Sequence, residues 1–64
     1  MNEKPRCKLI GENGNIYNLM SIAMKTLREH NQSEQADELF ERITKTAENY
    51  DQALVIIMDY VDVY

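Results

Sequence analysis

The sequence has few of the residues that most often mark catalysis or crosslinking. Among its 64 residues are one cysteine, Cys7, and one histidine, His30. A single cysteine rules out a disulfide within one molecule, and no ligand pattern around it indicates a zinc site. We therefore expect no metal ion and no bound cofactor. A chain this short is expected to form one domain, residues 1–64, of marginal stability.

Long apolar runs are also missing. The longest, Ala53–Met58, is too short to span a bilayer, and residues 1–5 lack the apolar core of a signal peptide. We therefore expect a cytoplasmic protein that does not enter membranes. Seven Lys and Arg stand against eleven Asp and Glu, so the formal net charge is −4. This charge repels phosphate backbones and argues against direct binding of nucleic acid.

Only two glycines are present, Gly11 and Gly14, in a turn that ends at Asn15. Their spacing matches neither phosphate-binding glycine pattern, and Glu12 places a negative charge where a phosphate would lie. A calcium loop is excluded as well, because the acidic ligands that should precede the glycine are missing. We therefore predict that the turn has a structural role and binds no ligand. We expect a positive φ, or another conformation specific to glycine, at Gly14 and a helix capped by Asn15.

Apolar residues recur at helical spacing in three stretches after the turn. We predict helices near residues 15–30, 33–48 and 51–62, preceded by an arm and turn over residues 1–14. The fold class is therefore all-α, a three-helix domain with an extended N-terminal arm. The predicted core consists of Ile16, Met20, Ala23, Leu27, Leu39, Phe40, Ile43, Leu54, Ile57, Met58 and Val61.

The breaks between these helices contain residues that cap helices well. We expect Asn31 or Ser33 to cap the second helix and Asp51 to cap the third. Two alternatives stay open. The Asn13-Gly14 pair could close a hairpin in place of the first helix, and the β-branched residues of Val61–Tyr64 could end the chain as a strand.

The arm alternates bases with apolar residues, and its bases are Lys4, Arg6 and Lys8. This alternation is typical of an extended segment or a short strand. At the other end of the chain, Asp59, Asp62 and the terminal carboxylate crowd the C-terminal end of the third helix, where the helix dipole is also negative. We therefore expect the arm to run beside the third helix and to place a base near Asp59 or Asp62.

Charged residues cover one side of the second helix, as expected for a solvated face. Glu38 with Arg42, and Glu41 with Lys45, are spaced four residues apart in the order that stabilises a helix. We therefore predict two surface ion pairs and no binding function for this run of charges.

Catalysis needs polar groups that converge, and the sequence offers few. His30 is expected at the solvated end of the first helix, where a cation suits the helix dipole. Cys7 could act as a nucleophile only with a base and an orienting group beside it, and the sequence indicates neither. We therefore predict that the protein is not an enzyme.

Several apolar residues exceed what one small core can cover. Ile22 lies off the apolar stripe of the first helix, and Val55 lies off that of the third helix. The apolar arc of the third helix is unusually wide and also includes Ile56 and Tyr60. We predict that these four residues form an interface. We expect self-association there, or binding of another protein.

A longer pattern runs from Cys7 to Tyr17 and continues through a helix, an acidic helix and Tyr50-Asp51 before a last apolar helix. It resembles a family of small uncharacterised bacterial proteins carried by prophages and integrative mobile elements. The signature of that family is a turn with an apolar residue followed by Gly-x-(Asp/Asn)-Gly-Asn. The resemblance covers nearly the whole chain. It implies a helical fold and a mobile-element setting, and no cofactor or site residue.

These observations favour a non-enzymatic accessory or regulatory protein that acts through protein-protein contacts. The alternative is a small nucleic-acid-associated regulator that uses the basic arm, with Lys4, Arg6 and Lys8 as its contact residues. A salt-dependent interaction with DNA or RNA would distinguish the second hypothesis from the first.

Overall fold

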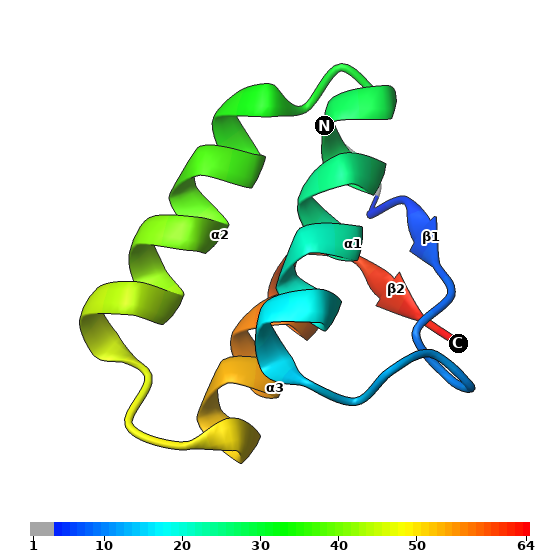
Figure 1. The fold of residues 1–64 in the computed structure, drawn as a ribbon. Coiled ribbons are helices and arrows are strands. Elements are labelled where there is room, and N and C mark those ends of the chain that lie inside the picture. Colours follow the sequence, from blue (N-terminus) through cyan, green and yellow to red (C-terminus); the bar gives the residue numbers. More distant parts are fainter. Residues whose placement is uncertain (1–3) are drawn as a thin grey trace.

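The fold consists of three helices and two short strands, described for residues 4–64 by a computed structural model (Figure 1). The helices α1 and α2 lie side by side in one layer, and α3 crosses behind them together with the strands. The predicted all-α class is confirmed, as is the extended arm before the first helix. In chain order the elements are β1 (Arg6–Cys7), α1 (Ile16–Glu29), α2 (Ser33–Thr46), α3 (Tyr50–Tyr60) and β2 (Asp62–Val63).

Two asparagines start α1. The Asn15 Oδ1 accepts a hydrogen bond from the Tyr17 N–H at 2.9 Å, and the Asn13 Oδ1 accepts one from the Asn15 N–H at 2.9 Å. Asn15 is therefore the N-cap, as predicted, and the hairpin alternative is excluded. The expected positive φ at Gly14 is wrong, because the left-handed glycine of the turn is Gly11, with φ 91°. The chain reverses there, before it reaches Gly14.

The turn between α1 and α2 places Asn31 in the left-handed region, with φ 60°. The Asn31 N–H donates to the Arg28 carbonyl at 3.2 Å, and the Gln32 N–H donates to the Leu27 carbonyl at 2.8 Å. This pair of bonds is a Schellman motif, which satisfies the last carbonyls of a helix. Asn31 therefore ends α1. The N-cap of α2 is Gln32, so the prediction of Asn31 or Ser33 as that cap is wrong.

The cap of α3 is Asn49, two residues before the predicted Asp51. The Asn49 Oδ1 accepts from the Gln52 N–H at 2.9 Å, while the Gln52 Oε1 accepts from the Glu48 N–H at 2.8 Å. Asp51 lies in the first turn, where a carboxylate still suits the helix dipole. The helix ends at Tyr60, earlier than predicted, and the strand alternative for the last residues is realised as β2.

The two strands join the N-terminal arm to the last residues. They pair in parallel, with Arg6 opposite Asp62 and Cys7 opposite Val63. Beyond these pairs, the Leu9 N–H donates to the Tyr64 carbonyl at 2.8 Å. The arm therefore docks as an extended segment along the end of the chain, and its alternate residues are carried into the core.

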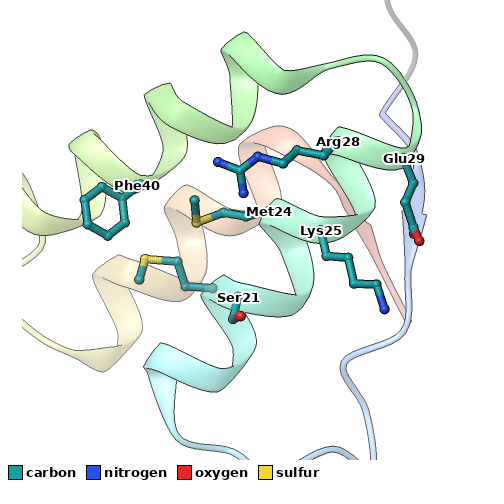
Figure 2. Close-up of a pocket in the computed structure, with 7 residues that line it drawn as sticks. Ser21, Met24, Lys25, Arg28, Glu29 and Phe40 are labelled. Atoms are coloured by element: carbon teal, nitrogen blue, oxygen red, sulfur yellow. The ribbon is translucent and has the colours of Figure 1, made fainter.

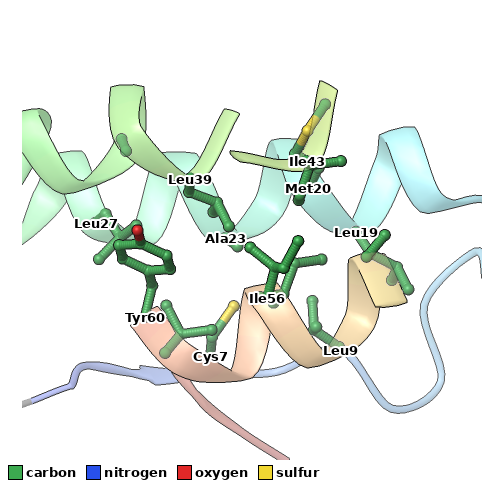
Figure 3. Packing of buried hydrophobic residues seen from close by; sticks show 14 residues of the cluster. Cys7, Leu9, Leu19, Met20, Ala23, Leu27, Leu39, Ile43, Ile56 and Tyr60 are labelled. Atoms are coloured by element: carbon green, nitrogen blue, oxygen red, sulfur yellow. The ribbon is translucent and has the colours of Figure 1, made fainter. Parts of the chain in front are cut away.

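The core lies between the two layers and receives residues from all three helices and the arm (Figure 3). Phe40 and Met58 were predicted to be buried, but both are about half exposed, and Ile16 and Leu54 are only partly buried. The apolar arcs of α2 and α3 are wider than the side that faces the core, so spacing alone does not determine which residues are covered. The buried residues absent from the prediction are Pro5, Cys7, Leu9, Leu19, Ala36, Ala53, Ile56 and Tyr60.

Candidate functional site

A hollow of the described surface lies between α1 and α2, on the side away from α3 (Figure 2), and we call it the α1–α2 groove. Its apolar side chains are Met20, Met24 and Phe40, and those of Met24 and Phe40 point toward one another across the hollow. Phe40 is 46% exposed, although it follows a fully buried leucine in the sequence. The groove therefore presents an aromatic ring to solvent beside the flexible side chain of Met24, while Met20, which is 6% exposed, belongs to the core beneath them.

Charged residues of both signs surround the α1–α2 groove. The bases are Lys25, Arg28 and Lys45, and the acids are Glu29, Asp37 and Glu41. Arg28 pairs with Asp37 at 3.1 Å across the two helices, and Lys45 pairs with Glu41 at 2.6 Å within α2, as predicted. Both pairs are solvent-exposed and contribute little to stability. The rim is therefore electrically balanced, whereas the chain as a whole has a net charge of −4.

The chemistry of the α1–α2 groove suits binding by burial of apolar surface. Methionine side chains are unbranched and repack around different shapes, and an exposed aromatic ring offers a large area to bury. The polar groups at the rim belong to long, exposed side chains that face solvent. The arrangement can receive an apolar side chain from another molecule, with charges around it that fix orientation.

A second cluster connects α2 to α3, and we call it the α2–α3 network. The Tyr60 hydroxyl donates to the Glu38 Oε1 and accepts from the Arg42 Nη1 at 3.3 Å. The Arg42 Nη2 also donates to the Asp59 Oδ2 at 3.3 Å. The predicted pair of Glu38 and Arg42 is thus replaced by contacts that both residues make with Tyr60.

Burial raises the pKa of Tyr60, and the hydrogen bond to Glu38 raises it further. The hydrogen bond to Tyr60 is the main reason that the pKa of Arg42 is also raised. The hydroxyl therefore stays protonated and the guanidinium stays charged over a wide pH range. Because neither group is prepared to exchange a proton near neutral pH, the network acts as a structural link between the helices.

The four residues predicted as an interface do not share one surface. Ile56 and Tyr60 are buried in the core, and Ile22 is partly buried against it. The prediction is corrected for Ile56 and Tyr60, because α3 is rotated so that both face α2. Val55 alone of the four is well exposed, at 60%, and it lines a shallow hollow between α2 and α3 together with Arg42 and Thr46.

Cys7 and His30 do not form a catalytic pair. The Cys7 side chain is 1% exposed, and its Sγ accepts a hydrogen bond from the Thr26 Oγ1 at 3.5 Å. His30 is the exposed C-cap of α1, and its Nδ1 lies 2.8 Å from the Thr26 carbonyl, to which it donates. Within residues 4–64, no three His, Cys, Asp or Glu side chains gather closely enough to hold a metal ion.

The bases of the arm meet other partners than the predicted carboxylates. The Lys4 Nζ donates to the Met58 carbonyl at 3.0 Å, near the C-terminal end of α3. The Arg6 guanidinium lies over the Tyr64 ring, 4.3 Å from its centroid. Asp59 pairs with Arg42 instead. The arm thus lies beside the end of α3, as expected, and offsets its dipole through a backbone carbonyl rather than through an ion pair.

Comparisons with known proteins found no relative of this chain. No protein-family model, curated protein or solved structure matches the chain. None of the helices between residues 4 and 64 has the length and apolar character needed to cross a bilayer.

Proposed function

We propose that the protein is a non-enzymatic accessory or regulatory protein that acts by binding proteins, and that its α1–α2 groove binds a second copy of the same chain. The observation that carries this proposal is the half-exposed Phe40 beside Met20 and Met24. Aromatic residues and methionine are enriched at protein interfaces relative to the rest of protein surfaces. The resemblance to proteins of mobile elements supports an accessory role of this kind in the cytoplasm.

The charge of the groove supports a second copy as its occupant. Two copies with a net charge of −4 repel each other over most of their surfaces. Around the groove, however, three bases and three acids are interspersed, so two such faces meet without net repulsion. In a two-fold arrangement, each contact between a base of one copy and an acid of the other occurs twice.

The size of the molecule supports the same occupant. The Cα atoms extend over 29 × 26 × 15 Å, and the layer of α1 and α2 forms the broad side (Figure 1). A face of this outline approaches the ~800 Å² that each partner buries in a standard interface. A small domain also gains stability when it covers apolar surface by association.

The test compares two variants by sedimentation velocity from micromolar to millimolar concentration. Phe40→Ser should weaken self-association about tenfold or more, because aromatic residues near the centre of an interface carry much of the binding energy. Val55→Ser is the matched control, since it removes an exposed apolar residue from α3 and should leave association unchanged. A wild-type protein that stays monomeric at all concentrations would refute the proposal. Loss of association only in Val55→Ser would assign the contact to α3 instead.

A further inference from the structure

The strand β1 uses only one of its two edges within the described chain. The Pro5 carbonyl accepts from the Asp62 N–H at 2.9 Å, and the Cys7 carbonyl accepts from the Tyr64 N–H at 3.0 Å. In an extended strand, the backbone groups of successive residues point to opposite edges. The N–H and C=O groups of the intervening residues, Arg6 and Lys8, therefore point away from β2. Figure 1 shows β1 at the rim of the molecule.

The side chains of the arm alternate between exposed and buried, just as its backbone groups alternate between the two edges. Pro5, Cys7 and Leu9 are buried, whereas Lys4, Arg6 and Lys8 are exposed. Among the ion pairs of residues 4–64, none involves these three bases. The outward side of the arm thus has unpaired backbone groups at its edge. Of its three bases, Lys4 donates to the Met58 carbonyl and Arg6 lies over the Tyr64 ring, so among the described residues Lys8 is the base that has no partner.

We propose that the outer edge of β1 binds an extended acidic segment of another protein as a third strand. Addition of a strand to an exposed sheet edge is a common mode of peptide recognition, in which backbone bonds give affinity and alternate side chains give specificity. In such a complex, an acidic residue of the added strand lies beside Lys8, which has no other partner among the described residues. A second acidic residue, two positions away, lies near Arg6, which also contacts the Tyr64 ring. Opposite charges on neighbouring strands stabilise the pairing.

The charges of the edge also exclude other occupants. Bases and a proline on an edge strand prevent two identical edges from pairing, because like charges face each other. A nucleic acid can accept hydrogen bonds from the Arg6 and Lys8 N–H groups, but its phosphates cannot donate to their carbonyls. A peptide satisfies both kinds of group, and a short acidic segment experiences less of the overall charge of −4 than a long polyanion does.

The experiment titrates the isotope-labelled protein with a synthetic peptide of alternating glutamate and valine and follows backbone amides by NMR. Binding as a strand should shift the Arg6 and Lys8 amide resonances downfield and slow their hydrogen exchange. A peptide with the glutamates replaced by lysines, and a single-stranded oligonucleotide, are titrated in parallel. The proposal fails if the Arg6 and Lys8 amides do not respond, or if the oligonucleotide binds more tightly than the acidic peptide.

Two variants with equal change of net charge test whether the charge acts locally. Lys8→Glu should weaken binding of the acidic peptide about fivefold or more, while Lys45→Glu, on α2, should have little effect. Equal weakening by both would show a long-range attraction without strand addition. Phe40→Ser should still bind the peptide at full strength. The two surfaces are therefore tested separately, and failure of one proposal leaves the other standing.

Discussion

The two sides of α2 are built differently. Toward α3, the α2–α3 network ties the helix down with a chain of contacts through Glu38, Tyr60, Arg42 and Asp59. Toward the outer side of α1, the α1–α2 groove leaves Phe40 half exposed, with only exposed ion pairs near it. One side of the helix has its polar partners within the domain, and the other side offers apolar surface to solvent.

This difference shows how one amphipathic helix can serve packing and binding together. Because the hydroxyl of Tyr60 needs partners where the ring is buried, it holds α2 and α3 at a fixed rotation. The methionines of the groove impose no such geometry, since their contacts are non-directional. Rigidity is therefore concentrated on the side that faces α3, and adaptability on the side that faces solvent.

The largest effect is expected from a substitution in the core, which tests whether the α2–α3 network and the α1–α2 groove share one core. Leu39 is fully buried beneath them. Leu39→Ala should lower the free energy of unfolding by about 2–5 kcal/mol, through lost burial and the cavity that remains. Urea denaturation at a concentration below self-association measures it. Val55→Ala on the exposed side of α3 is the control, and a similar loss in both variants would contradict a single shared core.

A smaller effect is expected at the turn that joins α1 to α2, because this turn fixes the width of the groove. Asn31 is left-handed there, and alanine is strained in that region. Asn31→Ala should destabilise by about 1 kcal/mol, whereas Asn31→Gly should be neutral or stabilising. Thermal unfolding of the two variants decides the matter. If glycine were as harmful as alanine, the asparagine side chain and not its backbone would hold the turn.

The α2–α3 network should respond to pH. Because the pKa of Tyr60 is raised on folding, its contribution to stability is complete below the ordinary tyrosine pKa of about 10. Above that pH, the unfolded chain releases its proton first, so the contribution is lost as pH rises through the folded-state pKa. Tyr60→Phe should therefore cost about 1 kcal/mol at neutral pH and less at alkaline pH.

Denaturation midpoints at neutral and alkaline pH provide the measurement for Tyr60→Phe. Tyr17→Phe is the control, because Tyr17 is 71% exposed and its substitution should leave the pH dependence as it is in the wild type. An equal alkaline decline in wild type and Tyr60→Phe would show that the hydroxyl of Tyr60 does not contribute.

The smallest expected effect is that of removing the Phe40 ring from the groove on the stability of the monomer. Phe40→Ser should alter the free energy of unfolding by no more than about 0.5 kcal/mol, as for other exposed positions. Chemical denaturation of the dilute protein measures this change. A loss comparable to that of Leu39→Ala would mean that Phe40 belongs to the core after all.

Much of the fold followed from local patterns. The helices were predictable because apolar spacing of three and four residues continues over several turns, and Asn15 caps α1 through its own side chain. The caps of α2 and α3 were harder, since Asn31 and Asp51 are good caps that lie one and two residues from the positions actually used. Neighbouring polar residues compete for such roles, and the contacts of the whole domain select among them.

The candidate site was harder to predict from the sequence than the fold. Phe40 and Leu39 are adjacent apolar residues on a wide stripe, and only the docking of α2 on α1 decides which of them is covered. In the same way, the hydroxyl of Tyr60 finds Glu38 and Arg42 only after α2 and α3 have packed. No signal near Tyr60 in the sequence indicates these partners, which are 22 and 18 residues away.

The pairing of β1 with β2 has a consequence for synthesis on the ribosome. Cys7 and Leu9 are buried, yet the backbone bonds that hold their strand come from Asp62 and Tyr64. The arm is made first but cannot dock until the last residues of α3 and β2 have left the exit tunnel. While the ribosome is still adding residues to α3, the nascent chain therefore exposes an unclosed core, which can close only once residues 62–64 are free to pair with the arm.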